Sequence, residues 1–70
     1  MISDVEYDLL SMLQSKLEGL EAYEMYLQDA EEAGDDALRQ LIEEIQRDDE
    51  KHAGRLREQL ARVLSGSGSR

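Results

Sequence analysis

The chain has 70 residues and a formal net charge of −9, and it contains no Cys, Pro, Trp or Phe. So short a chain forms one domain at most, and without Cys it has no disulfide or thiolate-bound metal to compensate for a small core. Nucleic-acid binding needs a basic surface, which a chain with 17 acidic and 8 basic residues does not offer.

The residue types and the N-terminal segment favour a helical protein of the cytoplasm. Leu, Glu, Ala, Asp, Gln and Arg dominate, and most of these are good helix formers, whereas β-branched and aromatic residues are scarce. No apolar run is long enough to cross a membrane, and the acidic first residues lack the features of a signal peptide. Because the absence of Cys also suits a reducing compartment, we expect an all-α protein located in the cytoplasm.

The first periodic segment runs from about residue 4 to residue 33. Its apolar residues recur at steps of three, four and seven, which is the pattern of an amphipathic helix. They are Leu9, Leu13, Leu20, Leu27 and Ala30. Ser3 or Asp4 is expected to supply the N-cap oxygen at the start of this helix.

A break at residues 33–36 separates the two periodic segments. Gly34 suits the left-handed conformation just beyond a helix end, and Asp35 suits the N-cap of the next helix. Asp36 adds negative charge at the positive end of that helix. Because this connection is so short, we expect the two helices to be antiparallel neighbours.

The second helix is predicted from about residue 36 to residue 64. Its apolar stripe has heptad-like spacing and consists of Leu38, Ile42, Ile45, Leu56 and Val63. The Ser/Gly-rich segment 65–70 that follows is predicted to be a flexible tail.

One hairpin cannot cover both of its apolar stripes, because each helix has only one neighbour on which to pack. Two hairpins together can cover four stripes. The sequence therefore predicts a homodimer that forms a four-helix bundle, with a larger homo-oligomer as the alternative.

Two polar residues, Asp49 and His52, interrupt the stripe of the second helix. Three residues apart, they emerge on one face of the helix and are expected to point inward. A carboxylate can bridge two cations while a neutral imidazole ligates one of them, so this spacing is compatible with a metal site. A hydrogen-bonded pair, or a pair at the wet edge of the stripe, explains the same spacing without a metal.

The first helix carries polar residues at a similar depth. Lys16 lies within its apolar stripe, Glu24 lies close to that stripe, and Glu21 lies further round. Tyr23 and Tyr26 flank the stripe, where each can either hydrogen-bond a core carboxylate or direct its hydroxyl to water.

The stretch from Leu17 to Leu60 resembles the ferritin-like superfamily, in particular the rubrerythrin-type hairpin and the half-length ferritin-like subunits that are cargo of encapsulin shells. Segment 48–53, with Leu56 after it, resembles the family's Glu-x-x-His-Ala-x-x-Leu. Tyr23 resembles the first-helix tyrosine that hydrogen-bonds a ligand carboxylate. The resemblance covers about two-thirds of the chain.

That resemblance implies a metal site in the bundle core. His52 would be a metal ligand and Asp49 a bridging carboxylate, while Glu24 and Glu21 would join them if the first helix rotates. The ligand set suits Fe, with Mn or Zn as alternatives, and Fe would imply ferroxidase or peroxide-reducing chemistry. A protein shell is the partner that the cargo resemblance suggests.

The sequence departs from the family pattern at two positions. Asp49 replaces a longer Glu, and Lys16 stands seven residues before Tyr23, where the family has a metal-binding Glu. Counting back from Tyr26 instead reaches Gly19. A sharp alternative follows, in which the Lys16 ammonium pairs with Asp49 and takes the place of the metal ion.

Three functional interpretations remain open at this point. The first is a metal-binding ferritin-like bundle. The second is a non-catalytic oligomerising helical module that keeps the fold without metal. The third, suggested by the Ser/Gly tail alone, is a minimised or engineered hairpin.

Overall fold

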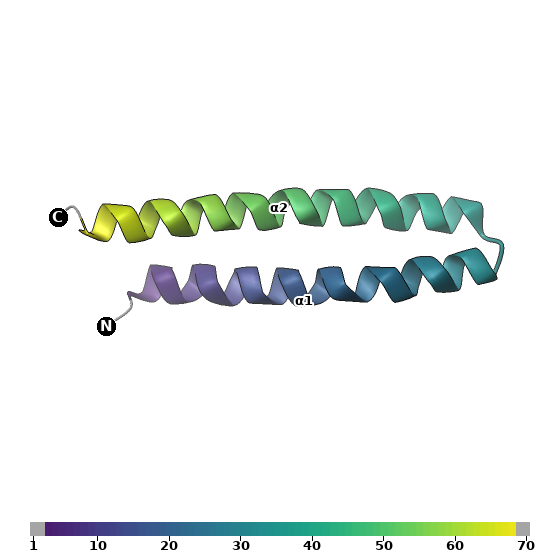
Figure 1. Ribbon diagram of the computed structural model, residues 1–70, viewed down its shortest axis with the longest axis horizontal. Coiled ribbons are helices and arrows are strands. Elements are labelled where there is room, and N and C mark those ends of the chain that lie inside the picture. The colour runs from purple at the N-terminus through teal and green to yellow at the C-terminus, as the bar shows by residue number, and fades with distance from the viewer. Residues whose placement is uncertain (1–2, 69–70) are drawn as a thin grey trace.

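The protein is a hairpin of two long antiparallel helices, α1 (Asp4–Glu32) and α2 (Asp36–Gly68) (Figure 1). The computed structural model describes residues 3–68, and these contain no strand. The two helices pack against each other side by side along a rod about 55 Å long. The prediction of an all-α antiparallel hairpin is therefore confirmed. Within the described range, neither helix is apolar enough over a sufficient length to cross a membrane.

A capping box fixes the start of α1. The Ser3 hydroxyl accepts a hydrogen bond from the backbone N–H of Glu6 at 3.1 Å, and the Glu6 carboxylate accepts one from the backbone N–H of Ser3 at 3.1 Å. This reciprocal arrangement satisfies two N–H groups that have no partner inside the helix. Of the two N-cap candidates, Ser3 is the cap.

The turn between the helices is built from local backbone preferences. Gly34 has a φ of +68°, a left-handed conformation that glycine adopts without steric cost. The backbone N–H of Asp35 donates to the carbonyl of Ala30 at 3.0 Å, which closes the end of α1. The Asp35 carboxylate accepts from the backbone N–H of Leu38 at 3.0 Å and caps α2. The predicted roles of Gly34 and Asp35 are both confirmed.

The end of α2 differs from the predicted end near Leu64. The helix continues to Gly68, so segment 65–68 is helical where a flexible tail was expected. Once a helix is formed, each further residue adds one backbone hydrogen bond, and no Pro is present to stop that propagation. Residues 69–70 of the predicted tail lie outside the described residues.

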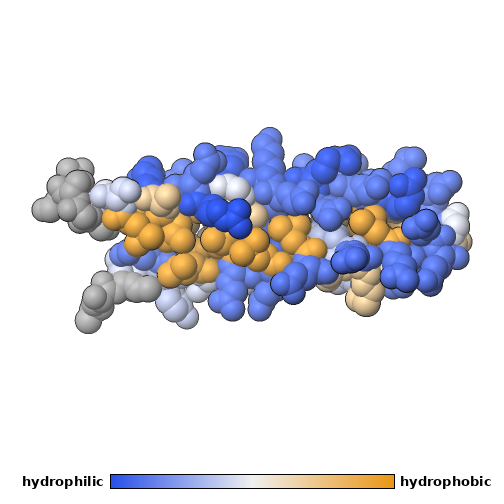
Figure 2. All heavy atoms as spheres, viewed as in Figure 1, coloured by the Kyte–Doolittle hydropathy of each residue, from blue (hydrophilic) through white to orange (hydrophobic). Residues whose placement is uncertain are grey.

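The core of the single hairpin is very small. Among the described residues, the buried apolar side chains are those of Ala30 and Ala53, and no large side chain is fully buried. Figure 2 shows apolar residues gathered along the seam between the helices, most densely in the half that holds the termini. The large apolar residues that stay exposed are Val5, Tyr7, Leu10, Met12, Leu17, Met25, Tyr26, Leu38, Leu41, Ile45 and Leu64.

The exposed residues include part of the stripe that was predicted to be core. Leu38 is 43% exposed and Ile45 is 42% exposed, although both belong to the periodic apolar face of α2. A single layer of two helices covers only the side chains that point directly at the seam. The remainder of each amphipathic face stays open in the isolated chain.

We expect Gly34→Ala to destabilise the fold by about 1–2 kcal/mol, because an added Cβ opposes the left-handed conformation. The measurement is the free energy of urea-induced unfolding, followed by circular dichroism at a fixed protein concentration. Gly54→Ala is the matched control, since Gly54 lies inside α2 with open space around its Cα. That change is expected to stabilise the helix by about 0.5–1 kcal/mol. Equal effects at both positions would contradict this account of the turn.

Candidate functional site

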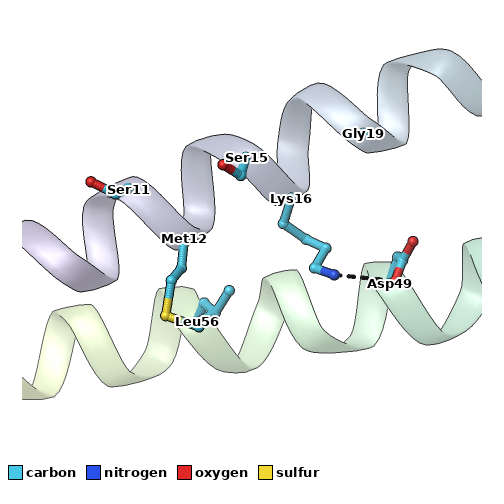
Figure 3. Close-up of a pocket in the computed structure, with 7 residues that line it drawn as sticks. All are labelled: Ser11, Met12, Ser15, Lys16, Gly19, Asp49 and Leu56. Atoms are coloured by element: carbon cyan, nitrogen blue, oxygen red, sulfur yellow. Dashed lines mark hydrogen bonds and ion pairs between the residues drawn. The ribbon is translucent and has the colours of Figure 1, made fainter.

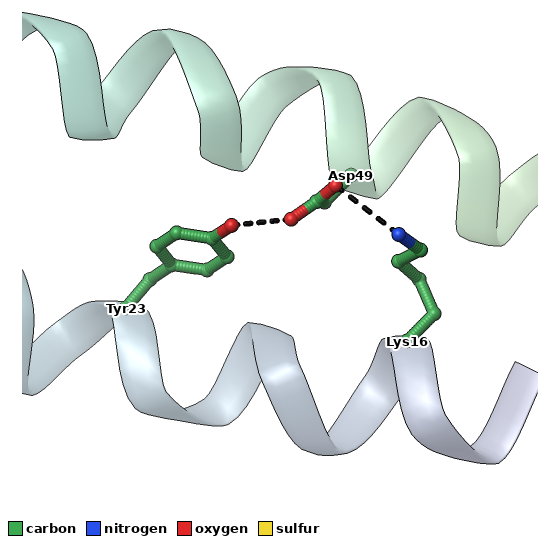
Figure 4. Close-up of polar contacts among 3 residues, drawn as sticks. All are labelled: Lys16, Tyr23 and Asp49. Carbon is green, nitrogen blue, oxygen red and sulfur yellow. Dashed lines mark hydrogen bonds and ion pairs between the residues drawn. The ribbon is translucent and has the colours of Figure 1, made fainter.

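Three polar side chains meet at the middle of the hairpin, between α1 and α2 (Figure 4). The Lys16 Nζ donates to one carboxylate oxygen of Asp49 at 3.3 Å, and the Tyr23 hydroxyl donates to the other. We call these residues, Lys16, Tyr23 and Asp49, the central cluster. The ion pair between Lys16 and Asp49 that the sequence suggested is confirmed, as is a hydrogen bond from Tyr23 to this carboxylate.

Helix periodicity brings the central cluster together. Lys16 and Tyr23 are seven residues apart, so they lie two turns apart on the same face of α1. Asp49 lies one turn before the buried Ala53, which places it on the face of α2 that packs against α1. As Figure 4 shows, the two α1 side chains approach the carboxylate from opposite directions along the helix.

The surroundings of Asp49 favour its ionised form. The hydrogen bond from Tyr23 is the largest cause that lowers the pKa of Asp49, and Lys16 and His52 lower it further, against a smaller opposing effect of burial. The same hydrogen bond, with burial and the negative charge of Asp49, raises the pKa of Tyr23 to about 12. The cluster at neutral pH is therefore a carboxylate held by one neutral hydroxyl and one ammonium group.

The ion pair itself contributes little stability to the isolated hairpin. The side chains of Lys16 and Asp49 are 33% and 24% exposed, so water still reaches both charges. Solvent screens an ion pair in such surroundings and weakens the attraction between its two charges. The ion pair matters for the site because it holds the Lys16 ammonium next to the Asp49 carboxylate.

The ring of Tyr23 is held in place by a second tyrosine. The Tyr26 ring meets it edge to face, with the centroids 5.9 Å apart and the planes at 89°. This T-shaped geometry is a favourable one for aromatic pairs. Tyr26 is 46% exposed and packs against Tyr23.

His52 is exposed in the single hairpin, and it influences Asp49 through its charge. It lies along a shallow groove of about 430 Å³. The groove is lined by Met12, Lys16, His52, Arg55, Leu56 and Gln59. The position of His52 around the helix explains its exposure. Asp49 and Ala53 face α1, whereas His52 lies further round α2, away from the side that packs against α1.

The predicted metal ligands do not converge within one chain. Glu21 and Glu24 are exposed on α1, and Glu21 lies along a different groove with Leu10, Leu13 and Leu17. Across residues 3–68, no three His, Asp or Glu side chains come together in a way that could hold a metal ion. Residues 3–68 of one chain therefore do not by themselves form a metal centre, and the ammonium of Lys16 already occupies one side of Asp49.

The structure also shows a groove beside the central cluster that the motifs did not indicate (Figure 3). Met12 reaches from α1 toward Leu56 of α2, and Lys16 reaches toward Asp49 at the next level. The groove is open here because α1 lines it with small residues, which are Ser11, Ser15 and Gly19. Their four-residue spacing is the sequence signal that indicates this open flank of α1.

A scan against protein-family models, a search of curated proteins and a search of solved structures each gave no match to this chain. The ferritin-like resemblance therefore remains a prediction from the motifs.

We expect the Tyr23 hydroxyl to ionise near pH 12 in an absorbance titration of tyrosinate. Since its pKa is raised in the fold, its contribution to stability is complete below pH 10 and is lost as the pH rises toward 12. For Asp49, whose pKa is lowered, the contribution is complete above the ordinary value of 3.8 and is lost as the pH falls below it.

Tyr23→Phe should remove this high-pH step, whereas the control Tyr26→Phe should keep a step near pH 12. A titration curve in which Tyr23→Phe retains that step would show that the hydrogen bond to Asp49 is absent in solution.

Proposed function

We propose that this chain is a non-catalytic assembly module, in which two hairpins pack face to face as a four-helix bundle without a metal ion. One observation carries the proposal: no large apolar side chain of the described residues is fully buried in the single hairpin. A chain with no Cys has no disulfide with which to offset so small a core. A second copy presents the complementary surface in the form of the same amphipathic faces.

The open apolar face of α2 supports this proposal energetically. Leu38, Leu41 and Ile45 are each between 42% and 51% exposed. Removing the rest of such a side chain from water contributes about 1 kcal/mol, and twofold symmetry doubles every contribution. The face is also continuous, since these residues follow one another at three- and four-residue steps.

The central cluster suits the interior of such a bundle. Covering Asp49 with a second hairpin removes water from its carboxylate, which is costly unless the charge is paired and hydrogen-bonded. Lys16 and Tyr23 supply a countercharge and a hydroxyl donor within the same chain. The cluster then acts as a polar layer of fixed geometry, and Lys16 stands where the ferritin-like resemblance would require a metal-binding carboxylate.

We expect the parent protein to sediment at twice the 8.0 kDa chain mass and Ile45→Lys to shift it to the monomer. The charged side chain would have to be buried in both copies, so the dissociation constant should rise roughly a hundredfold. Gln40→Lys is the matched control, because Gln40 is exposed and lies about 140° around α2 from Ile45. A monomeric parent protein in analytical ultracentrifugation would overturn the proposal.

A metal site shared between copies is the second candidate. One observation favours it: Tyr23 holds Asp49 as the ferritin-like resemblance implies for a ligand carboxylate, and His52 follows one turn later with its ring exposed. Two copies would bring two such pairs into one bundle. Iron, manganese or zinc would suit these donors, and the ion would have to displace Lys16 from Asp49.

Calorimetric titration of Zn(II) and of anaerobic Fe(II) separates the two candidates. For the assembly module we expect no saturable binding by the parent protein. Lys16→Glu removes the competing cation and adds a carboxylate beside Asp49, so this variant should gain saturable binding. Binding by the parent that is lost in His52→Ala would instead favour the shared metal site.

A further inference from the structure

Charge is distributed very unevenly along the rod. The half that contains the turn, residues 17–50, holds 13 acidic and two basic residues, a net charge of −11. The half that contains the termini, residues 3–16 and 51–68, holds four acidic and five basic residues, a net charge of +1 with His52 neutral. We call these the turn half and the open half.

The central cluster marks the boundary between the two halves. The midpoint of α1 (Asp4–Glu32) is residue 18 and that of α2 (Asp36–Gly68) is residue 52, so the contact between Lys16 and Asp49 lies close to the middle of the rod. The charge difference therefore divides the molecule at mid-length. It makes the hairpin a long electric dipole whose acidic end is the turn.

Two hairpins can pack face to face with twofold symmetry in two ways. With the turns at the same end, the two turn halves lie side by side, and a charge of −11 faces a charge of −11. With the turns at opposite ends, each turn half lies against the open half of the other copy. Neighbouring helices in a bundle are about 8–10 Å apart, which is comparable with the screening length of about 8 Å at physiological ionic strength, so this repulsion is only partly screened.

We propose that the second copy docks end for end, with the acidic turn half of each hairpin against the open half of the other. The inference rests on the proposed assembly function and specifies its geometry. In this arrangement α2 lies against α2 of the second copy. The open half of α2 holds four basic residues and one acidic residue, and it meets the turn half of the other copy's α2, which has a net charge of −4. This attraction offsets the repulsion between the two α1 helices.

The end-for-end arrangement also fixes which residues meet. The 29 residues of α1 lie alongside residues 36–64 of α2. Full overlap of these two-helix parts places the twofold axis near residue 50, so residues equally far before and after it face each other across the two α2 helices. Arg55 lies five residues after it and Glu44 six residues before it. Arg55 lines the open groove, and the exposed Glu44 lies three residues after Leu41 on the same flank. Arg55 of one copy therefore pairs with Glu44 of the second copy.

The orientation can be measured with a spin label at a single introduced thiol, because the chain has no Cys of its own. Glu31 is exposed and lies 13 residues from residue 18, the midpoint of α1, about 20 Å at the rise of an α-helix. For Glu31→Cys, pulsed electron resonance should give a distance of about 40 Å between the copies if they dock end for end. With the turns together, that distance would be only the bundle width, roughly 20 Å.

A mixed dimer provides the reciprocal measurement. Ser65 lies near the end of the open half, so a label at Ser65→Cys in one copy should lie close to a label at Glu31→Cys in the other. A long distance in this mixed sample, together with a short one between two Glu31→Cys copies, would overturn the inference.

Charge exchange tests the pair directly. We expect each of the single variants, Arg55→Glu and Glu44→Arg, to raise the dimer dissociation constant by roughly tenfold, because each removes two symmetry-related contacts. The double variant should recover most of the lost affinity. Within one chain the two residues are 11 positions apart, about 16 Å, so rescue cannot come from an internal contact. Arg57→Glu is the control for the loss of one basic residue from the open half.

The outcomes separate this inference from the assembly proposal. A dimer whose Glu31→Cys labels lie close together would overturn the end-for-end docking and leave the assembly function standing. A protein that sediments as a monomer would overturn both.

Discussion

Each helix of this hairpin has a single neighbour, and that constraint governs the rest of the structure. The seam accommodates residues that point straight across it, of which Ala30 and Ala53 are buried, while Leu38 and Ile45 on the same amphipathic faces remain open to water. Local signals such as the capping box and the turn determine where the helices begin and end, but they add no core. Stability beyond the seam therefore depends on what covers the open faces.

The central cluster shows how one carboxylate can be accommodated on such a face. Asp49 has two hydrogen-bond partners within its own chain, one neutral and one cationic, so a covering hairpin need not supply any. An unpaired carboxylate at this position would oppose assembly, because burial would favour its neutral form. The arrangement thus permits burial of the layer at neutral pH, and it also sets Lys16 in the position that a metal ion would have to take.

Sequence reasoning succeeded where a local or periodic rule decides the outcome. Gly34 and Asp35 identified the turn because their backbone preferences are intrinsic. The pairing of Lys16 with Asp49 was predicted from the ferritin-like resemblance, because Lys16 stands where that family has a ligand carboxylate. Sequence reasoning was less successful where the rotation of a helix by a few tens of degrees matters. His52 is exposed although it is only three residues from Asp49, because periodicity alone does not fix the direction in which a stripe's edge faces. The end of α2 was also placed too early, because the Ser/Gly-rich segment 65–68, which predicted a tail, continues the helix.

Charge supplies directional information for the proposed association. The acids gathered in the turn half and the bases gathered late in α2 distinguish turns together from turns apart. In the proposed dimer, the like charges of the two turn halves oppose the arrangement with the turns together, and repulsion of this kind gives specificity by excluding an alternative. In this proposal apolar area drives association, and the charge distribution selects its geometry.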